Sequence, residues 1–257
     1  MEAAVYREFL ELEQTHWWFR GRRAIFISLL DRYVRRRPAG DRGPPRVLMD
    51  LGCGVGGMLE PLSAYGRVIG TDVTLQGLRY CAERKFPLLV ACNGPHGCFL
   101  DASLDCVTAF DALEHIEDDE QALREIHRML RPGGTLIASG PAYQFLYAQQ
   151  DRITHHMRRY TRGGLVGKAR AAGFEVVQAS YINFWLFPAI LPTVLLLKLW
   201  QAVRPRDDAQ AGSNVGIKVP GWTHDLLTAV FASEAAVLRH VSVPVGHSLI
   251  VVARKPD

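Results

Sequence analysis

The chain has 257 residues, 48% of them hydrophobic, and its formal net charge is +4 at pH 7. This length fits one α/β domain with additions, and the apolar content is sufficient for a sizeable hydrophobic core. The five cysteines form no even framework, which argues against a disulfide-stapled secreted protein and favours reduced thiols in the cytoplasm.

Residues 1–44 predict two helices and then a linker rich in proline and glycine at 38–45. The start lacks the basic residues and apolar run of a signal peptide. The run His16–Arg20 places aromatic side chains beside basic ones, which either roof a pocket or pack on the core. Nine arginines lie between positions 20 and 46. A solvated helix face is favoured over a phosphate or anionic lipid partner, and nothing resembles a nucleic-acid-binding module.

The stretch Val47–Gly57, VLMDLGCGVGG, joins an apolar strand to a glycine-rich turn. Its first three residues have the composition of a buried parallel strand. The glycines let the backbone approach a ligand closely, because they carry no Cβ and φ can be positive. A helix predicted from Gly56 to Tyr65 would point its N-terminal N–H groups at that ligand.

Two classes of ligand compete for this loop. The run Gly52–Gly57 satisfies the dinucleotide pattern G-x-G-x-x-G, which favours a nicotinamide cofactor. Asp50 favours the other class, because its charge repels a pyrophosphate and attracts a cation such as the ammonium or sulfonium of S-adenosylmethionine. A second strand, Arg67–Gly70, leads to Asp72, whose carboxylate suits the two hydroxyls of a ribose.

Asp50, Gly52, Gly54 and Gly56 match D-x-G-x-G-x-G, so the stretch resembles motif I of the class I S-adenosylmethionine-dependent methyltransferases. The resemblance spans residues 45–180 and implies a doubly wound, seven-stranded, mostly parallel sheet with S-adenosylmethionine as cofactor. Where the family usually has Asp, this chain has Asn93, whose carbonyl still accepts a hydrogen bond from adenine. The implied cofactor site consists of Asp50, Gly52, Cys53, Gly54, Asp72, Val73, Asn93, Gly94 and Phe110.

Strands and helices alternate as far as residue 180, which predicts a parallel sheet with helices on both faces. The run Asp111–Ile116, DALEHI, resembles the family's motif after the fourth strand, which borders the transferred methyl. Cys92, His96 and Cys98 are clustered without a second ligand pair at zinc spacing, so no metal site is expected. The other predicted elements are Leu75–Lys85, Leu88–Cys92, Asp105–Phe110, a helix from Asp118 to a stop at Arg131–Gly134, Thr135–Ser139, Leu165–Ala172 and Phe174–Ala179.

Residues 140–165 form the predicted substrate side, because ligands sit at the carboxyl ends of such strands. The run resembles a bacterial subgroup of the family with an H-x-x-R-R-Y-T block, which fits from His155 and, with one residue fewer, from His156. An alcohol or phenol acceptor needs a base near neutral pH, a role that histidine suits. The candidate bases are His115, His155 and His156, and the candidate substrate residues are Tyr143, Arg159 and Tyr160.

A long insert, 181–245, separates the core from the predicted last strand at 246–257. Its run Phe184–Trp200 is apolar, but it has only 17 residues and contains two prolines, so it is too short for a spanning helix. A second helix is predicted at Trp222–His240. We predict that the insert is a helical, hydrophobic cap over an acceptor pocket. The alternative is peripheral membrane contact through residues 184–200.

These features predict a methyltransferase that moves a methyl group from S-adenosylmethionine to an oxygen or nitrogen atom of a small acceptor. The apolar insert adds the hypothesis that this acceptor is lipophilic. A nicotinamide-dependent oxidoreductase is the first alternative, although the chain has no Tyr-x-x-x-Lys pair. A methyltransferase-like binding protein on a membrane surface is the second.

Overall fold

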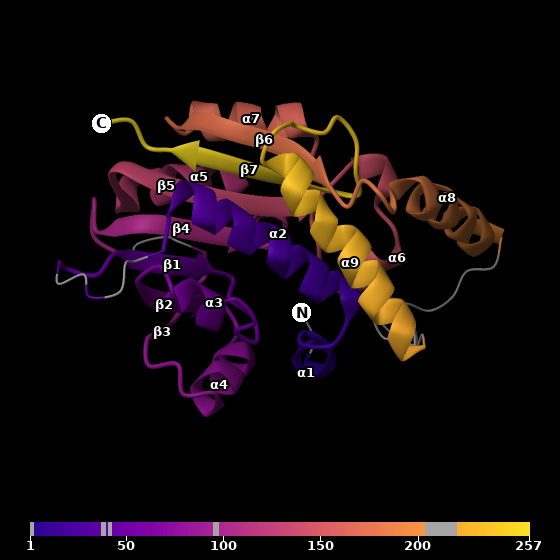
Figure 1. Ribbon diagram of the computed structural model, residues 1–257, viewed down its shortest axis with the longest axis horizontal. Coiled ribbons are helices and arrows are strands. Elements are labelled where there is room, and N and C mark those ends of the chain that lie inside the picture. The colour runs from indigo at the N-terminus through magenta and orange to yellow at the C-terminus, as the bar shows by residue number, and fades with distance from the viewer. Residues whose placement is uncertain (1–2, 37–39, 41–42, 95–97, 204–219) are drawn as a thin grey trace.

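Seven strands form a single sheet in the order β3-β2-β1-β4-β5-β7-β6 (Figure 1). The computed structural model describes residues 3–36, 40, 43–94, 98–203 and 220–257. Only β7 runs antiparallel to its neighbours, which confirms the predicted doubly wound, mostly parallel sheet. The strands are β1 (Val47–Leu51), β2 (Arg67–Asp72), β3 (Leu89–Ala91), β4 (Leu104–Phe110), β5 (Leu130–Pro141), β6 (Glu175–Ile182) and β7 (Ser248–Arg254).

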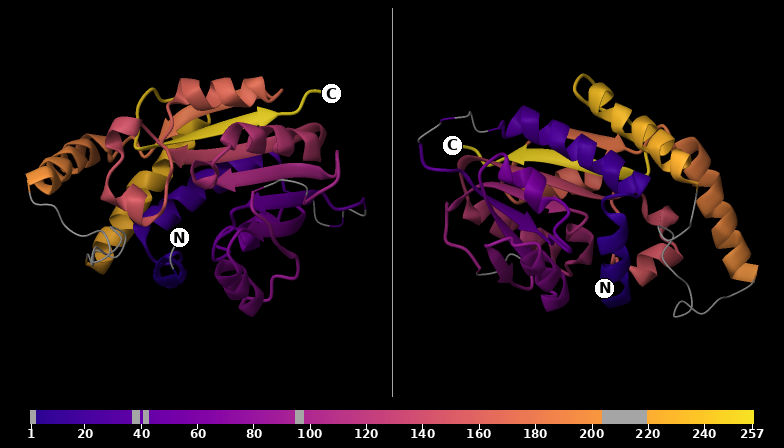
Figure 2. Two further views of the ribbon diagram at one scale, coloured as in Figure 1. Left: turned by 180° about the vertical axis from the view of Figure 1, so that it is seen from behind. Right: turned by 60° about the horizontal axis from the view of Figure 1, so that its bottom comes forward.

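Helices cover both faces of the sheet (Figures 1 and 2). One face packs on α2 and α9, which lie side by side, and the other packs on α5 and α7. The α-helices are α1 (Ala3–Leu12), α2 (Trp17–Tyr33), α3 (Leu59–Ser63), α4 (Leu75–Glu83), α5 (Asp119–Met129), α6 (Gln149–Ile153), α7 (Arg162–Ala171), α8 (Phe187–Val203) and α9 (Gly221–Leu238), with short 3-10 turns at η1 (Leu113–His115) and η2 (Gln144–Leu146).

The alternation of side chains along each strand divides the core into two layers. In β1, Met49 joins the cluster under α5 and α7, whereas Leu48 joins the cluster under α2 and α9. β4 repeats this pattern with Val107 and Cys106. Because successive strand residues point to opposite faces, an apolar run is what a strand covered on both sides requires.

The N-terminal arginines mostly bind other parts of the chain. The Nη1 atom of Arg20 lies 2.7 Å from Asp225 on α9, and that of Arg32 donates to the backbone oxygen of Arg239. Arg22 forms an ion pair with Asp111. Arg37 and Arg42 lie outside the described residues, as does part of the predicted linker. Arg20, Arg22 and Arg32 therefore bind other parts of the protein, whereas the sequence favours a solvated helix face.

Several element boundaries differ from the sequence prediction for local reasons. α3 begins at Leu59 instead of Gly56, because Gly56 has a φ of +87°, outside the helical region. α7 begins three residues early, at Arg162, where the hydroxyl of Thr161 accepts a hydrogen bond from the backbone N–H of Gly164. The predicted stop at Arg131–Gly134 lies within β5.

The described residues of the insert form two helices between β6 and β7, as its composition predicted. α9 returns along α2, whereas α8 extends away from the rest of the molecule (Figures 1 and 2). None of the helices in the described part of the chain reaches the length and apolarity that a membrane crossing requires.

Candidate active site

One cavity of about 760 Å³ lies at the carboxyl ends of the parallel strands. This volume is within the range of small-ligand pockets. The ends of β1, β2 and β4 contribute one half of its wall, and η1, the segment after β5, α2 and α8 contribute the other. All nine residues predicted to bind the cofactor line it: Asp50, Gly52, Cys53, Gly54, Asp72, Val73, Asn93, Gly94 and Phe110.

The glycine loop has the shape that its sequence predicted. Gly52 has a φ of +70°, and a Cβ there would lie 2.8 Å from the Cβ of Ala112, so only glycine fits. Gly54 lines the cavity, and a Cβ at this position would meet no protein atom within 4 Å. The open side of this loop is therefore available to a ligand, as the cofactor site requires.

Asp72 is fixed at the end of β2 by several donors. Its Oδ1 accepts from the backbone N–H and hydroxyl of Thr74, at 2.8 and 2.6 Å, and from the hydroxyl of Tyr6 at 3.3 Å. Its Oδ2 accepts from the N–H of Gly54 at 2.9 Å. Since a carboxylate oxygen can accept about two hydrogen bonds, Oδ2 has room for a further donor such as a ribose hydroxyl.

Asp50 is an acid in the middle of the sheet. It is buried, and its Oδ1 accepts a hydrogen bond of 2.6 Å from the hydroxyl of Thr108. Burial raises the pKa of Asp50 to about 7, the hydrogen bond from Thr108 lowers it, and the charge of Asp72 adds to the increase. A cationic ligand in the cavity would favour the ionised carboxylate.

We therefore expect the affinity for S-adenosylmethionine to depend on pH through Asp50. Below pH 7 the carboxyl becomes neutral and no longer attracts the ligand's positive charge, so binding should weaken by up to about tenfold from pH 7 to pH 6. Asp50→Asn should bind about tenfold more weakly at pH 7 and lose this pH dependence. Calorimetric titration at pH 7 and pH 6 measures the dissociation constant of S-adenosylmethionine for both proteins. Equal pH dependence in the variant, or improved NAD binding, would contradict the role of Asp50.

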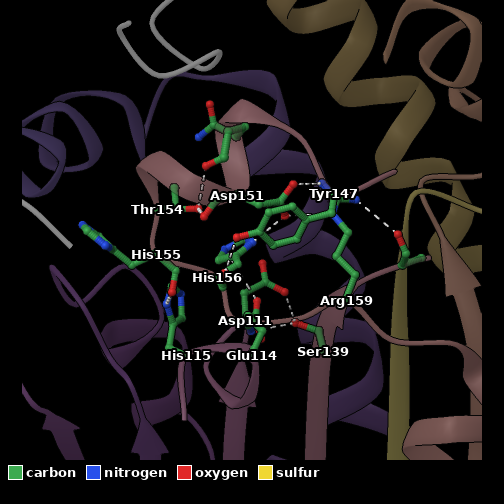
Figure 3. Close-up of polar contacts among 12 residues, drawn as sticks. Asp111, Glu114, His115, Ser139, Tyr147, Asp151, Thr154, His155, His156 and Arg159 are labelled. Atoms are coloured by element: carbon green, nitrogen blue, oxygen red, sulfur yellow. Dashed lines mark hydrogen bonds and ion pairs between the residues drawn. The ribbon is translucent and has the colours of Figure 1, made fainter. Parts of the chain in front are cut away.

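Three polar side chains meet in the part of the cavity wall formed by η1 and the segment after β5. Glu114, His115 and His156 each offer one oxygen or nitrogen atom, and these atoms all lie within 4.8 Å of one another. The Nε2 atom of His156 lies 4.0 Å from Oε1 of Glu114. Figure 3 shows the three side chains gathered beneath Asp151 and Arg159. We call Glu114, His115 and His156 the His–Glu cluster.

Asp151 positions two of the residues predicted to act in catalysis or substrate binding. Its Oδ1 lies 2.9 Å from Nδ1 of His156, and both of its oxygens accept from the guanidinium of Arg159, at 2.8 and 3.0 Å. Burial raises the pKa of Asp151, but the hydrogen bonds from His156 and Arg159 outweigh it and hold the pKa at about 2. Asp151 is therefore ionised, and it holds His156 with the proton on Nδ1.

Glu114 is fully buried, and neither of its carboxyl oxygens has a hydrogen-bond partner among the described residues. Burial raises its pKa to about 8, although the charges of Arg22 and Arg159 lower it. Burial lowers the pKa of His115 to about 4, so its imidazole is neutral near pH 7. Buried polar groups are normally satisfied, so Glu114 points to a partner that enters the cavity.

Of the remaining predicted catalytic and substrate residues, two line the cavity and two do not. His155 and Arg159 line it. Tyr160 is buried on the far side, where its hydroxyl donates to Oδ2 of Asp119 at 2.8 Å. Tyr143 stacks on Tyr181 and lies outside the cavity. His96, which the sequence grouped with Cys92 and Cys98, lies outside the described residues.

Apolar side chains also line the cavity. Ile190 and Val194 come from α8, and Trp17, Trp18 and Phe19 come from α2. The insert therefore contributes to the cavity wall, as the cap prediction requires. The aromatic run at the start of α2 lines the cavity as well, and Trp17 and Trp18 also pack against the core under α2 and α9, so the run has both of the roles considered for it.

Sequence reasoning missed Glu114 and Asp151 as site residues. Both positions stand in the runs that attracted attention, Asp111–Ile116 and residues 140–165. Carboxylates in those runs are common as surface groups, so their burial is the deciding observation, and burial depends on the folded chain. The adjacent pair Glu114–His115 was the available signal.

The sheet topology and the cavity at its carboxyl edge define a nucleotide-binding α/β protein of the methyltransferase type. Residues 49–138 match the family model of a methyltransferase domain. A demethylmenaquinone methyltransferase of Lactiplantibacillus plantarum is 34% identical, over 53% of this chain and 73% of that protein. A probable S-adenosylmethionine-dependent methyltransferase of Mycolicibacterium smegmatis is 28% identical, over 64% and 62%.

The chain belongs to the class I S-adenosylmethionine-dependent methyltransferases. The structure of such an enzyme from Archaeoglobus fulgidus has the same fold, with a TM-score of 0.57 at 16% identity over 96% of this chain and 99% of that one. This family membership decides against the nicotinamide alternative. The chain spans 45% to 64% of the length of the first three curated relatives that it matches.

Proposed function

We propose that this protein transfers the methyl group of S-adenosylmethionine to a hydroxyl oxygen, or to an amine nitrogen, of a small and largely apolar acceptor. One observation carries the proposal: a single cavity joins the nine predicted cofactor residues to the His–Glu cluster and an apolar wall. Bound S-adenosylmethionine would supply an electrophilic methyl carbon. The protein's contribution is then to align the acceptor and to accept its proton.

We assign His156 as the residue that accepts the proton of the acceptor. Asp151 keeps the proton on Nδ1, which leaves the lone pair of Nε2 on the side of Glu114. His155 lines the same cavity, and His115 is neutral near pH 7, so both remain candidates. Arg159 shares Asp151 with His156. We therefore assign Arg159 to shaping the acceptor half, by which we mean the part of the cavity lined by η1, α8 and the segment after β5.

The experiment compares formation of S-adenosylhomocysteine by the wild type and by His156→Gln, on a panel of apolar phenols, alcohols and amines. We expect His156→Gln to lower kcat by about 10²- to 10⁴-fold, because a positioned general base contributes this much. The affinity for S-adenosylmethionine should stay unchanged. His240→Gln, at an exposed position, is the matched control. An unchanged kcat would remove His156 from catalysis, and absence of turnover on the entire panel would contradict the proposed acceptor class.

Peripheral membrane contact is a second candidate function, favoured by the exposed face of α8. Leu196 and Leu199 are 65% and 66% exposed, and Leu195, Leu197 and Trp200 are each at least 40% exposed. Patches of this kind are typical of interaction sites. The cavity wall and the exposed face therefore use different residues of the same helix.

We expect purified protein to float with anionic liposomes in a density gradient. Replacing Leu195, Leu196 and Leu197 with serine should abolish flotation, because it removes much of the apolar area that lipid would bury. Circular dichroism and the Tm must stay unchanged in this variant. Wild-type protein that remains at the bottom of the gradient would restrict α8 to its role in the cavity wall.

A further inference from the structure

Both histidines of the His–Glu cluster have their Nδ1 atoms engaged. In His156, Nδ1 lies 2.9 Å from the carboxylate of Asp151, and in His115 it lies 3.3 Å from the backbone oxygen of His155. Each acceptor places the proton on Nδ1 and leaves the lone pair on Nε2. Histidines that bind metal ions almost always donate their other N–H to a carboxylate or a backbone carbonyl in this way.

Glu114 supplies a buried carboxyl group that forms no ion pair with an arginine or lysine in the described part of the chain. The guanidinium of Arg22 is paired with Asp111, and that of Arg159 with Asp151. Three carboxylates therefore share two guanidiniums, and the oxygens of Glu114 are those that have no hydrogen-bond partner in the described part of the chain. A carboxyl group that is buried and unpartnered in a cavity is suited to bind a cation that enters it.

We propose that Glu114, His115 and His156 bind a divalent transition-metal ion in the cavity that the predicted cofactor residues also line. Two imidazoles and one carboxylate form a known catalytic zinc set, which leaves a fourth position open. Ligand atoms around tetrahedral zinc are about 3.4 Å apart. Nε2 of His156 and Oε1 of Glu114 are 4.0 Å apart, so rotation of the two side-chain tips brings them into range.

The proposal rests on the proposed methyl transfer and gives His156 the role of a ligand instead of proton acceptor. A metal ion with an open position acts as a Lewis acid and lowers the pKa of a hydroxyl that binds to it. The acceptor's hydroxyl proton then leaves to water. The oxygen forms a bond to the methyl carbon while the carbon–sulfur bond breaks. The electron pair of the carbon–sulfur bond returns to sulfur. This favours oxygen over nitrogen as the methylated atom.

Zinc chloride is the probe, titrated calorimetrically into protein that has been dialysed against a chelator. We expect about one zinc ion per chain. Glu114→Gln, His115→Gln and His156→Gln should each lower the zinc affinity at least tenfold. Asp151→Asn should lower it about 10- to 100-fold, because the residues behind metal ligands tune affinity by this amount. His240→Gln controls for surface binding, and the affinity of each variant for S-adenosylhomocysteine verifies that it is folded.

Two results would overturn the metal site: no zinc binding by the wild type, or binding that Glu114→Gln leaves unchanged. The activity assay separates this inference from the proposed function. Full turnover in the presence of chelator would reject a role for the metal in catalysis and leave methyl transfer by His156 standing. Turnover that chelator abolishes and zinc restores would support the site. Zinc binding that depends on the cluster, without turnover on any acceptor, would support the site and contradict the proposed function.

Discussion

Asp72→Ala should weaken the binding of S-adenosylmethionine by about 10- to 10²-fold. A charge-assisted hydrogen bond is worth about 1.5–3 kcal/mol, and the variant loses the one that Oδ2 has room to accept from a ribose hydroxyl. It also releases the N–H of Gly54, which holds the glycine loop against β2, and the hydroxyl of Thr74 at the start of α4. Calorimetric titration measures the dissociation constant.

Two further variants make the result specific to Asp72. Asp72→Asn retains the size of the side chain but not its charge, so its affinity should fall between that of the wild type and that of Asp72→Ala. Asp225→Ala removes an exposed aspartate that pairs with Arg20, and should bind as the wild type does. A folded Asp72→Ala protein with wild-type affinity would exclude this carboxylate from the cofactor site.

Glu234→Ala should lower the free energy of unfolding by about 3–5 kcal/mol and the Tm by about 10 °C. Glu234 is fully buried on α9, and its carboxylate accepts three backbone N–H groups at 183–185, at 2.6, 2.8 and 3.1 Å. Removing the side chain leaves the buried N–H of Asn183 and the part-buried N–H groups of Phe184 and Trp185 without this acceptor. These donors lie just before α8, so the variant should also loosen the apolar wall of the acceptor half.

Urea unfolding followed by circular dichroism measures the loss of stability. Ser233→Ala, at the neighbouring exposed position of the same helix, should change stability by less than about 0.5 kcal/mol. Glu234→Gln retains one acceptor oxygen and should therefore be intermediate. If Glu234→Ala unfolds at the wild-type urea concentration, the carboxylate does not hold the start of the insert.

The cofactor half could be predicted from the sequence because its residues follow successive strands. A β-α-β chain places the carboxyl ends of parallel strands along one edge of the sheet. Asp50, Asp72, Asn93 and Phe110 each lie at or just after the end of a strand, so their places in the sequence imply their meeting in space. The glycine loop adds a local conformation that glycine alone adopts easily.

The acceptor half was decided only by the tertiary structure, because its contacts join segments far apart in the sequence. His156 and Glu114 are 42 positions apart, and Glu234 holds a turn about 50 positions earlier. Arg159 and Tyr160 are adjacent, yet they point to opposite sides, as successive residues of an extended segment do. Arg159 thus reaches Asp151 and the cavity, whereas Tyr160 reaches Asp119 in the core. A motif that names both residues cannot tell which of them faces the acceptor, because that depends on which neighbour covers each side of the segment.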